Sequence, residues 1–215
     1  MNQNNGCCTP PYPKKDDCCC KDGIICALDL FYQDFLSTTQ CFKEIKYYPS
    51  LPTFDVGGTI KIIPNTITDI LYITPDIVPI YTDDTKEDLT YLNICKINGF
   101  EFTIDTTNTS CNFKDTDITN RFNKVRYVSP KSCCCKNGIL EYLLKTREFL
   151  QTPPKVNAAI ISTSTNSFKI TDILAINPDT LWAKNVITDP TASTTYYVLS
   201  LCEITGITLD KFPLI

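Results

Sequence analysis

Apolar residues recur at helical spacing in two stretches of the chain. In the first stretch, Ile24, Leu28, Phe31 and Phe35 lie three or four positions apart, which is the period of an amphipathic helix. The second stretch has the same spacing and runs up to a Pro-Pro pair, at which a helix must stop. Its apolar positions are Ile139, Leu140, Leu143, Leu144 and Leu150. The pattern predicts one helix in each stretch.

After each predicted helix the chain changes to short runs rich in Ile, Val, Thr and Tyr, which are typical of strands. The first set of predicted strands is Thr59–Ile63, Ile67–Ile73, Leu89–Ile97 and Phe100–Ile104, and the second is Ala158–Ser162, Ser167–Ile176, Thr195–Ile204 and Ile207–Leu209. Asn98-Gly99 predicts a hairpin turn, and Thr205-Gly206 takes its place in the second set. We therefore expect a strand-dominated α+β fold.

Three blocks of sequence occur twice, in the same order. The pairs are Asp17–Ile24 with Ser132–Ile139, Thr68–Asp76 with Thr171–Asp179, and Leu92–Gly99 with Leu199–Gly206. Such order predicts a tandem duplication in which each copy is a helix followed by an antiparallel meander or small β-sandwich. The predicted divisions are a flexible Cys-containing N-terminal arm at 1–17, repeat module 1 at 18–106, a linker at 107–132 and repeat module 2 at 133–215.

Composition excludes several kinds of chemistry. The 215 residues include no histidine, so Ser-His-Asp or Cys-His catalysis and His-ligated metals are impossible. The net charge of −4 argues against nucleic acid or an anionic membrane as partner. No apolar run approaches the roughly 18 residues of a membrane span, and the polar, Pro-containing start lacks a secretion signal. Because no nucleophile has a plausible base, we expect neither an enzyme nor a cofactor.

Cysteine is the most distinctive residue, with 13 in the chain. Adjacent cysteines, about 3.8 Å apart at Cα, are poor partners for each other, because a disulfide usually requires about 4.4–6.8 Å. Asp17 and Ser132 are good helix N-caps, so each triplet should begin a helix, where the dipole and Lys21 or Lys136 favour the reactive thiolate. We therefore predict disulfide cross-linking at the adjacent cysteines, which are Cys7, Cys8, Cys18, Cys19, Cys20, Cys133, Cys134 and Cys135.

The other candidate sites are weaker. Cys26 and Cys41 could equally be ordinary core residues, and the core role is favoured for Cys95 and Cys202, which match each other in the duplication. No C-x₂-C pair occurs, which disfavours zinc, although a thiolate-only Zn or Cu(I) cluster needs no histidine. Two acidic pairs, Asp83-Asp84 and Asp115-Thr116-Asp117, could bind a divalent cation, but solvated turns are the favoured interpretation. We expect Trp182 to be a core residue.

Two Cys-Cys-Cys-Lys-x-Gly-Ile blocks, at 18–24 and 133–139, and the Cys7-Cys8 pair in the leading arm carry a resemblance. The sequence resembles the cysteine-rich structural proteins of the bacterial spore coat, exosporium and spore appendages. The resemblance is one of style and short motif, and it implies a self-assembling protein that is stabilised by disulfides. It also implies synthesis in the mother-cell cytoplasm without a signal peptide, followed by deposition on the spore surface and oxidation there.

The leading hypothesis is therefore a structural protein that forms an ordered lattice, filament or crystal with itself, and possibly with other cysteine-rich spore-surface proteins. Two alternatives stay open. One is a thiolate-cluster metal-binding protein, which would lose its fold on chelation. The other is a β-rich binding or toxin-like module stored in an inclusion, because strand-rich α+β domains host many functions.

Overall fold

The computed structural model describes residues 22–39, 41–50, 58–59, 77–81, 89–122, 137–152, 156–177, 179–187 and 193–210. Strands predominate over helices in this part of the chain, and every strand pairing is antiparallel. The predicted strand-dominated α+β class is confirmed.

The two predicted helices are present as α1 (Asp22–Leu36) and α4 (Asn137–Gln151). Ile24 and Phe31 on α1, and Leu143 on α4, are fully buried, as the helical spacing of the apolar residues predicts. The cysteine triplets and the proposed N-caps Asp17 and Ser132 lie outside the described residues.

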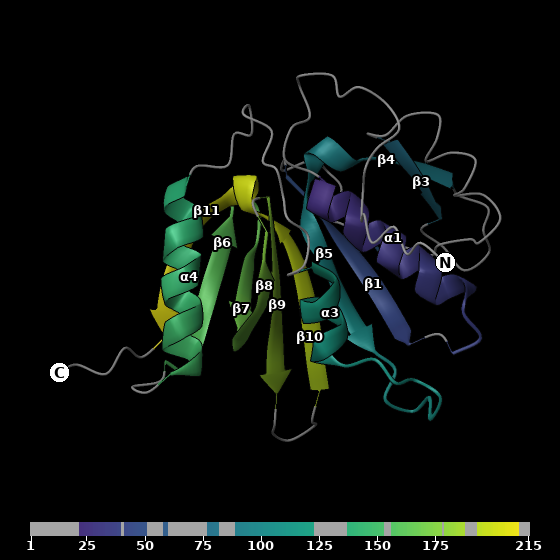
Figure 1. Ribbon diagram of the computed structural model, residues 1–215. Helices are drawn as coiled ribbons and strands as arrows, with labels where there is room; N and C mark the ends of the chain where they lie inside the picture. The colour runs from purple at the N-terminus through teal and green to yellow at the C-terminus, as the bar shows by residue number, and fades with distance from the viewer. Residues whose placement is uncertain are drawn as a thin grey trace, which may run out of the picture.

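The largest sheet has six strands and combines both halves of the chain (Figure 1). Its order is β2-β1-β5-β10-β9-β8. The first-half strands are β1 (Phe42–Pro49), β2 (Gly58–Thr59) and β5 (Ile97–Ile104), and the second-half strands are β8 (Asp172–Ile176), β9 (Thr180–Ile187) and β10 (Ser193–Ser200). The seam between the halves is the β5–β10 pairing, with Gly99 opposite Leu199 and Thr103 opposite Thr195.

Two smaller sheets complete the architecture. One has three strands in the order β11-β6-β7, formed by β6 (Ala158–Thr163), β7 (Ser167–Ile170) and β11 (Ile204–Asp210). The other is the pair of β3 (Ile77–Tyr81) and β4 (Leu89–Asn93). Two 3₁₀ segments, η2 (Ile94–Lys96) and η3 (Leu201–Glu203), connect β4 to β5 and β10 to β11.

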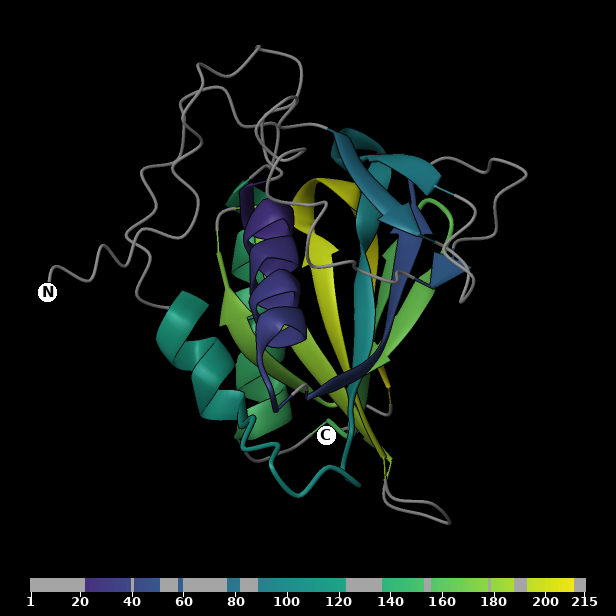
Figure 2. The same ribbon diagram turned by 90° about the vertical axis from the view of Figure 1, so that its right-hand side faces the viewer.

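Successive side chains of the central strands enter two different cores, as strand geometry requires. Trp182 on β9 and Val198 on β10 join α1 in one core. Leu181 and Leu199 join α4 and the three-stranded sheet in the other. Figure 2 shows α1 lying across one face of the six-stranded sheet. Phe31 of α1 anchors this face and makes edge-to-face ring contacts with Phe42, Phe100 and Phe102.

The hairpin prediction is wrong. Asn98-Gly99 lies inside β5, and Thr205-Gly206 lies inside β11. The two strands that a hairpin would join do not pair with each other in either half. β4 pairs with β3 whereas β5 pairs with β1 and β10, and β10 pairs with β9 and β5 whereas β11 pairs with β6. A 3₁₀ segment, and not an Asn-Gly turn, carries the chain from one sheet to the next.

Two further strand predictions need correction. The predicted strand Ser167–Ile176 is divided at Thr171 into β7 and β8, which belong to different sheets. The strands β1 and β3 were not predicted, and neither was the central strand β9. Its residues Leu181, Trp182 and Ala183 are all fully buried, so the strand lacks the apolar–polar alternation that marks a half-exposed strand.

The range predicted as a linker, 107–132, contains the helix α3 (Asp115–Phe122). Ile118 and Phe122 of this helix are buried, and the Phe122 ring stacks on Trp182 with centroids 4.1 Å apart. This segment therefore contributes to the first core. The sequence of this range also predicts a short strand at Val125–Val128, which lies outside the described residues.

Candidate functional site

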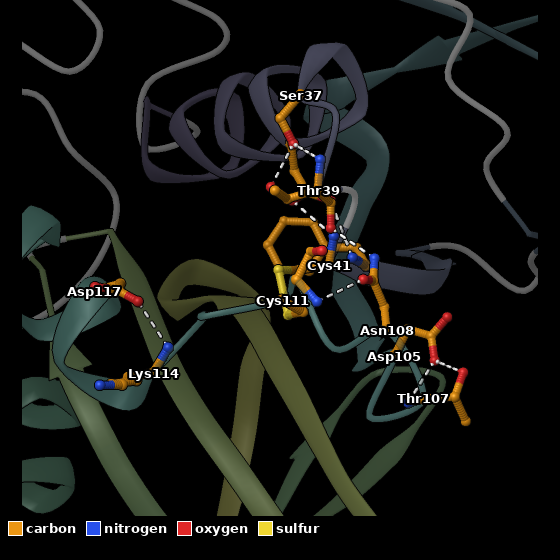
Figure 3. Close-up of a disulfide and its surroundings, with 12 residues drawn as sticks. Ser37, Thr39, Cys41, Asp105, Thr107, Asn108, Cys111, Lys114 and Asp117 are labelled. Atoms are coloured by element: carbon orange, nitrogen blue, oxygen red, sulfur yellow. Dashed lines mark hydrogen bonds between the residues drawn. A yellow bond between two sulfur atoms is a disulfide. The ribbon is translucent and has the colours of Figure 1, made fainter.

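A disulfide joins Cys41, just before β1, to Cys111 in the loop after β5, with their Cα atoms 5.0 Å apart (Figure 3). The surrounding backbone is held on both sides. The Asp34 carboxylate at the end of α1 accepts a hydrogen bond from the Cys41 backbone N–H at 2.9 Å. The Asn108 side chain donates to the Thr39 carbonyl at 2.8 Å. The disulfide therefore closes a hydrogen-bonded junction between the end of α1, β1 and the loop after β5.

Cys26, Cys95 and Cys202 are also disulfide-bonded. The expectation that Cys95 and Cys202 are core filler is therefore wrong. For Cys26 and Cys41 the two roles coincide, because these side chains are 3% and 6% exposed and each also forms a disulfide. The spacing of cysteines in the sequence does not reveal this pairing, because Cys41 and Cys111 are 70 residues apart.

The eight cysteines predicted to form cross-links all lie outside the described residues. They are Cys7, Cys8, Cys18, Cys19, Cys20, Cys133, Cys134 and Cys135. In contrast, all five cysteines of the described part are already disulfide-bonded.

The acidic pair Asp115 and Asp117 begins α3. Asp117 accepts a hydrogen bond from the Lys114 backbone N–H at 2.7 Å and so caps the helix. Asp115 forms an ion pair with Lys184 and accepts a hydrogen bond from the Tyr196 hydroxyl at 3.0 Å. Burial and the nearby Asp115 carboxylate raise the pKa of Tyr196. These carboxylates have structural partners, whereas Asp83 and Asp84 lie outside the described residues. Within the described ranges no three potential ligands gather into a metal site.

A second polar cluster lies on the other face of the six-stranded sheet. The Tyr48 hydroxyl donates to Glu101 at 2.6 Å, and Lys46 lies 3.5 Å from the same carboxylate. Burial and then Glu101 raise the pKa of Tyr48, and the same two causes raise the pKa of Tyr197 to about 12. The Tyr48 ring also contacts Phe168 of the three-stranded sheet. The cluster connects the six-stranded sheet to the three-stranded sheet.

Glycines mark two close approaches between the halves of the chain. A Cβ at Gly23 on α1 would lie 1.8 Å from Thr180 Oγ1. The Gly23 backbone N–H donates to the buried Asp179 carboxylate at 3.0 Å, so a second-half residue caps a first-half helix. A Cβ at Gly99 on β5 would lie 2.1 Å from the Val198 carbonyl oxygen on β10. Both contacts require glycine, and the sequence pattern did not reveal either one.

The sheet edges differ in how they are protected. The edge strand β2 has only two residues, and β7 has four and carries the exposed Lys169. Helices α3 and α4 both contact β8. The seven-residue β11 and the five-residue strands β3 and β4 each have one strand neighbour among the described residues, which leaves their other edges without a described partner. The edges of β11 and β4 lie on opposite sides of the molecule, β11 beside α4 and β4 at the far upper corner (Figure 1).

No helix in the described ranges is long and apolar enough to cross a membrane. No known protein family, curated protein or solved structure matches this chain.

Proposed function

We propose that this protein is a structural subunit of the spore surface, which assembles with copies of itself into an ordered lattice, filament or crystal and is locked by disulfides. It acts without a cofactor and is not an enzyme. The observation that carries the proposal is that β11 and β4, on opposite sides of the molecule, each keep one edge without a strand neighbour among the described residues. Open edges are ready-made sites for pairing with another chain, and monomeric proteins usually shorten, charge or cover them.

The proposal includes the tandem duplication. Helices α1 and α4 each have 15 residues and begin with Asp-Gly-Ile and Asn-Gly-Ile. Each half also contains a strand, a three-residue 3₁₀ segment and a second strand, as β4-η2-β5 and as β10-η3-β11. The first strand after each helix pairs with the last strand of its half, as β1 with β5 and β6 with β11. A subunit built from two similar modules offers similar surfaces twice, which favours repeated head-to-tail contacts.

Disulfides supply the lock in this proposal. Because the described cysteines are all bonded already, links between subunits are expected from those of the eight cysteines of the arm and the triplets that the described cysteines do not use. Non-covalent pairing would set the geometry, and disulfides would then slow dissociation. The flexible arm at 1–17 stays a prediction of the sequence.

The test is electrophoresis of assembled material with and without reductant, for wild type and for a variant with both triplets, Cys18–Cys20 and Cys133–Cys135, changed to serine. We expect a high-mass ladder that collapses to the 24.2 kDa chain with reductant, and a variant that dissolves in denaturant without reductant. The matched control changes the exposed Thr106 and Thr109 to alanine, which leaves every cysteine in place.

Two outcomes contradict the proposal. A wild-type chain that stays monomeric after oxidation contradicts self-assembly. A serine variant whose assemblies still resist denaturant contradicts the role of the triplets in cross-linking the subunits. Elemental analysis of the same wild-type sample separates the thiolate-cluster alternative, which requires stoichiometric Zn or Cu.

A further inference from the structure

The seam between β5 and β10 shows how this chain joins a strand of one half to a strand of the other. Five residue pairs connect these strands, from Gly99–Leu199 to Thr103–Thr195. β5 is bordered by β1 on its other side, and β10 is bordered by β9. The seam is therefore an antiparallel joint between two groups of strands.

Each strand of the seam has a counterpart elsewhere in the chain. The sequence block that ends in Ile97-Asn98-Gly99 recurs as Ile204-Thr205-Gly206, so β11 corresponds to β5 and β4 corresponds to β10. The neighbours correspond as well: β11 is bordered by β6 as β5 is by β1, and β4 is bordered by β3 as β10 is by β9. In both counterparts the edge that would form the seam is open among the described residues.

We propose that β11 of one copy pairs antiparallel with β4 of a second copy, in the register that β5 adopts with β10 within the chain. This inference rests on the proposed self-assembly and names its interface. Transferring the seam register places Leu209 opposite Leu89, Thr208 opposite Thr90, Ile207 opposite Tyr91 and Gly206 opposite Leu92. Cross-strand pairs of aliphatic, aromatic and threonine residues are of the kinds that stabilise sheets.

Gly206 is the independent observation that points to a second backbone. At the matching position on β5, a Cβ would collide with the β10 backbone. At Gly206 the nearest heavy atom to an added Cβ is Ser162 Cβ at 3.8 Å, an ordinary contact, and the backbone is not in a glycine-only conformation. Glycine inside a strand weakens it and often marks either a bulge or the close approach of another backbone, and Gly206 lies at the register shift that follows Ile204 in β11. The approaching backbone is absent from the described chain, and β4 of a second copy supplies it.

Burial supports the same conclusion. Phe100 and Phe102 on β5 are 0% exposed beneath the seam. Their counterparts Ile207 and Leu209 on β11 are only partly buried against the second core. A strand added along β11 would extend the cover over these side chains.

The proposed pairing propagates. Because β11 and β4 lie on opposite sides of one molecule (Figure 1), the contact joins two different surfaces and leaves one free edge at each end of the growing chain. Such a heterologous contact forms a ring when its rotation closes and a filament when it does not. The two smaller sheets of neighbouring copies become one continuous sheet at each joint.

The test compares three full-length chains with their disulfides intact: wild type, Gly206→Ala, and Lys169→Ala on β7 at the opposite edge of the same sheet. Sedimentation and electron microscopy measure assembly, and urea unfolding of the dilute proteins measures the fold. We expect wild type and Lys169→Ala to assemble and Gly206→Ala to remain monomeric with an unchanged unfolding midpoint. Mixed with wild type, Gly206→Ala should shorten assemblies in proportion to its mole fraction, because it still offers β4 but ends growth at β11.

A Gly206→Ala chain that assembles like wild type overturns the β11–β4 interface and leaves the proposed function standing, whereas a monomeric wild type overturns both. Hydrogen exchange of the unmodified chain provides a second measurement in case the variant unfolds. Amides of Gly206–Leu209 and Leu89–Leu92 should become protected on assembly. Exchange at the monomer rate in both segments of the assembled chain contradicts the interface.

Discussion

β5 and β11 have similar sequences and different surroundings. β5 lies at the centre of the six-stranded sheet, between β1 and β10, and Gly99 lets the β10 backbone approach closely. β11 lies at the edge of the three-stranded sheet, and no described atom requires Gly206 to be glycine. The same local pattern therefore forms a strand twice, but the neighbours of that strand are decided by distant parts of the chain.

The comparison separates two roles of glycine in a strand. At Gly99 the absence of a side chain is needed for the fold of the monomer, because Cβ and the Val198 carbonyl oxygen cannot share the same space. At Gly206, which lies at a register shift of β11, no described atom requires glycine, and the proposed β11–β4 contact is the place where a close backbone would require it. Four predictions test the seam at β5 and the contacts that stabilise the fold around it, from the largest expected effect to the smallest.

Replacing Gly99 with alanine should break the seam. The added Cβ would lie 2.1 Å from the Val198 carbonyl oxygen and 2.9 Å from the Leu199 Cα, so two strands must move apart. We expect the free energy of unfolding to fall by about 3 kcal/mol or more, measured by urea denaturation of the dilute monomer. Gly206→Ala is the matched control and should change it by less than about 1 kcal/mol. If both variants lost the same free energy of unfolding, the close backbone approach would not distinguish β5 from β11.

Replacing Cys111 with serine should weaken the junction between β1 and the loop after β5. Opening a loop of 70 residues restores chain entropy to the unfolded state, so we expect the free energy of unfolding to fall by about 2–4 kcal/mol. Denaturation of the oxidised proteins measures the change. Asn112→Ser, at the exposed neighbouring position, is the control and should lose less than about 0.5 kcal/mol. A Cys111→Ser chain as stable as that control would contradict a structural role for the disulfide.

Replacing Asp179 with alanine should loosen α1 from β9. The variant loses a buried carboxylate that accepts a hydrogen bond from the Gly23 N–H at 3.0 Å, and we expect the free energy of unfolding to fall by about 1–3 kcal/mol. Asp117→Ala removes an exposed cap on α3 and should lose about 0.5–1 kcal/mol. Chemical denaturation of both variants measures the difference, and a larger loss in Asp117→Ala would reverse the expected order.

Alkaline pH should destabilise the fold through the tyrosines around the seam. The pKa values of Tyr48, Tyr196 and Tyr197 are raised, mainly by burial, so above about pH 10 the unfolded chain loses protons that the folded chain keeps. The free energy of unfolding should then fall as pH rises, by up to about 1.4 kcal/mol per pH unit for each such tyrosine. Urea unfolding between pH 9 and 11, with free thiols alkylated first, measures this slope.

Tyr48→Phe should reduce that alkaline slope, since it removes one of the three groups. Tyr142→Phe on α4, where the tyrosine is 65% exposed, should leave it unchanged. An identical slope in wild type and Tyr48→Phe would show that folding does not raise the pKa of Tyr48.

Several features could be predicted from sequence because they depend on local patterns. Helical spacing identified α1 and α4, and strand-forming runs identified much of β5, β6 and β10. The burial of Trp182 was also expected. In contrast, β9 was missed because its two faces are both covered, and Asn98-Gly99 suggested a turn because the dipeptide is common in hairpins. Its real environment is set by Leu199, which lies about 100 positions further along the chain.

For the candidate interface, sequence alone identified the repeated blocks and the eight cysteines expected to form cross-links. It did not identify the Cys41–Cys111 bond, the Asp179 cap on α1 or the open edges of β4 and β11. Each of these depends on which segments meet in space.

The amino-acid sequence by itself determined the helices α1 and α4, the strand-rich character, the absence of histidine chemistry and the repeated blocks, because these follow from residue type and short-range spacing. Tertiary structure alone decided that β5 faces β10, that Cys41 meets Cys111 and that a Cβ at Gly206 would make only an ordinary contact with the described atoms. The physical reason is that a strand satisfies its own backbone geometry locally, whereas its hydrogen-bonding edges are satisfied only by whatever chain the whole fold brings beside it.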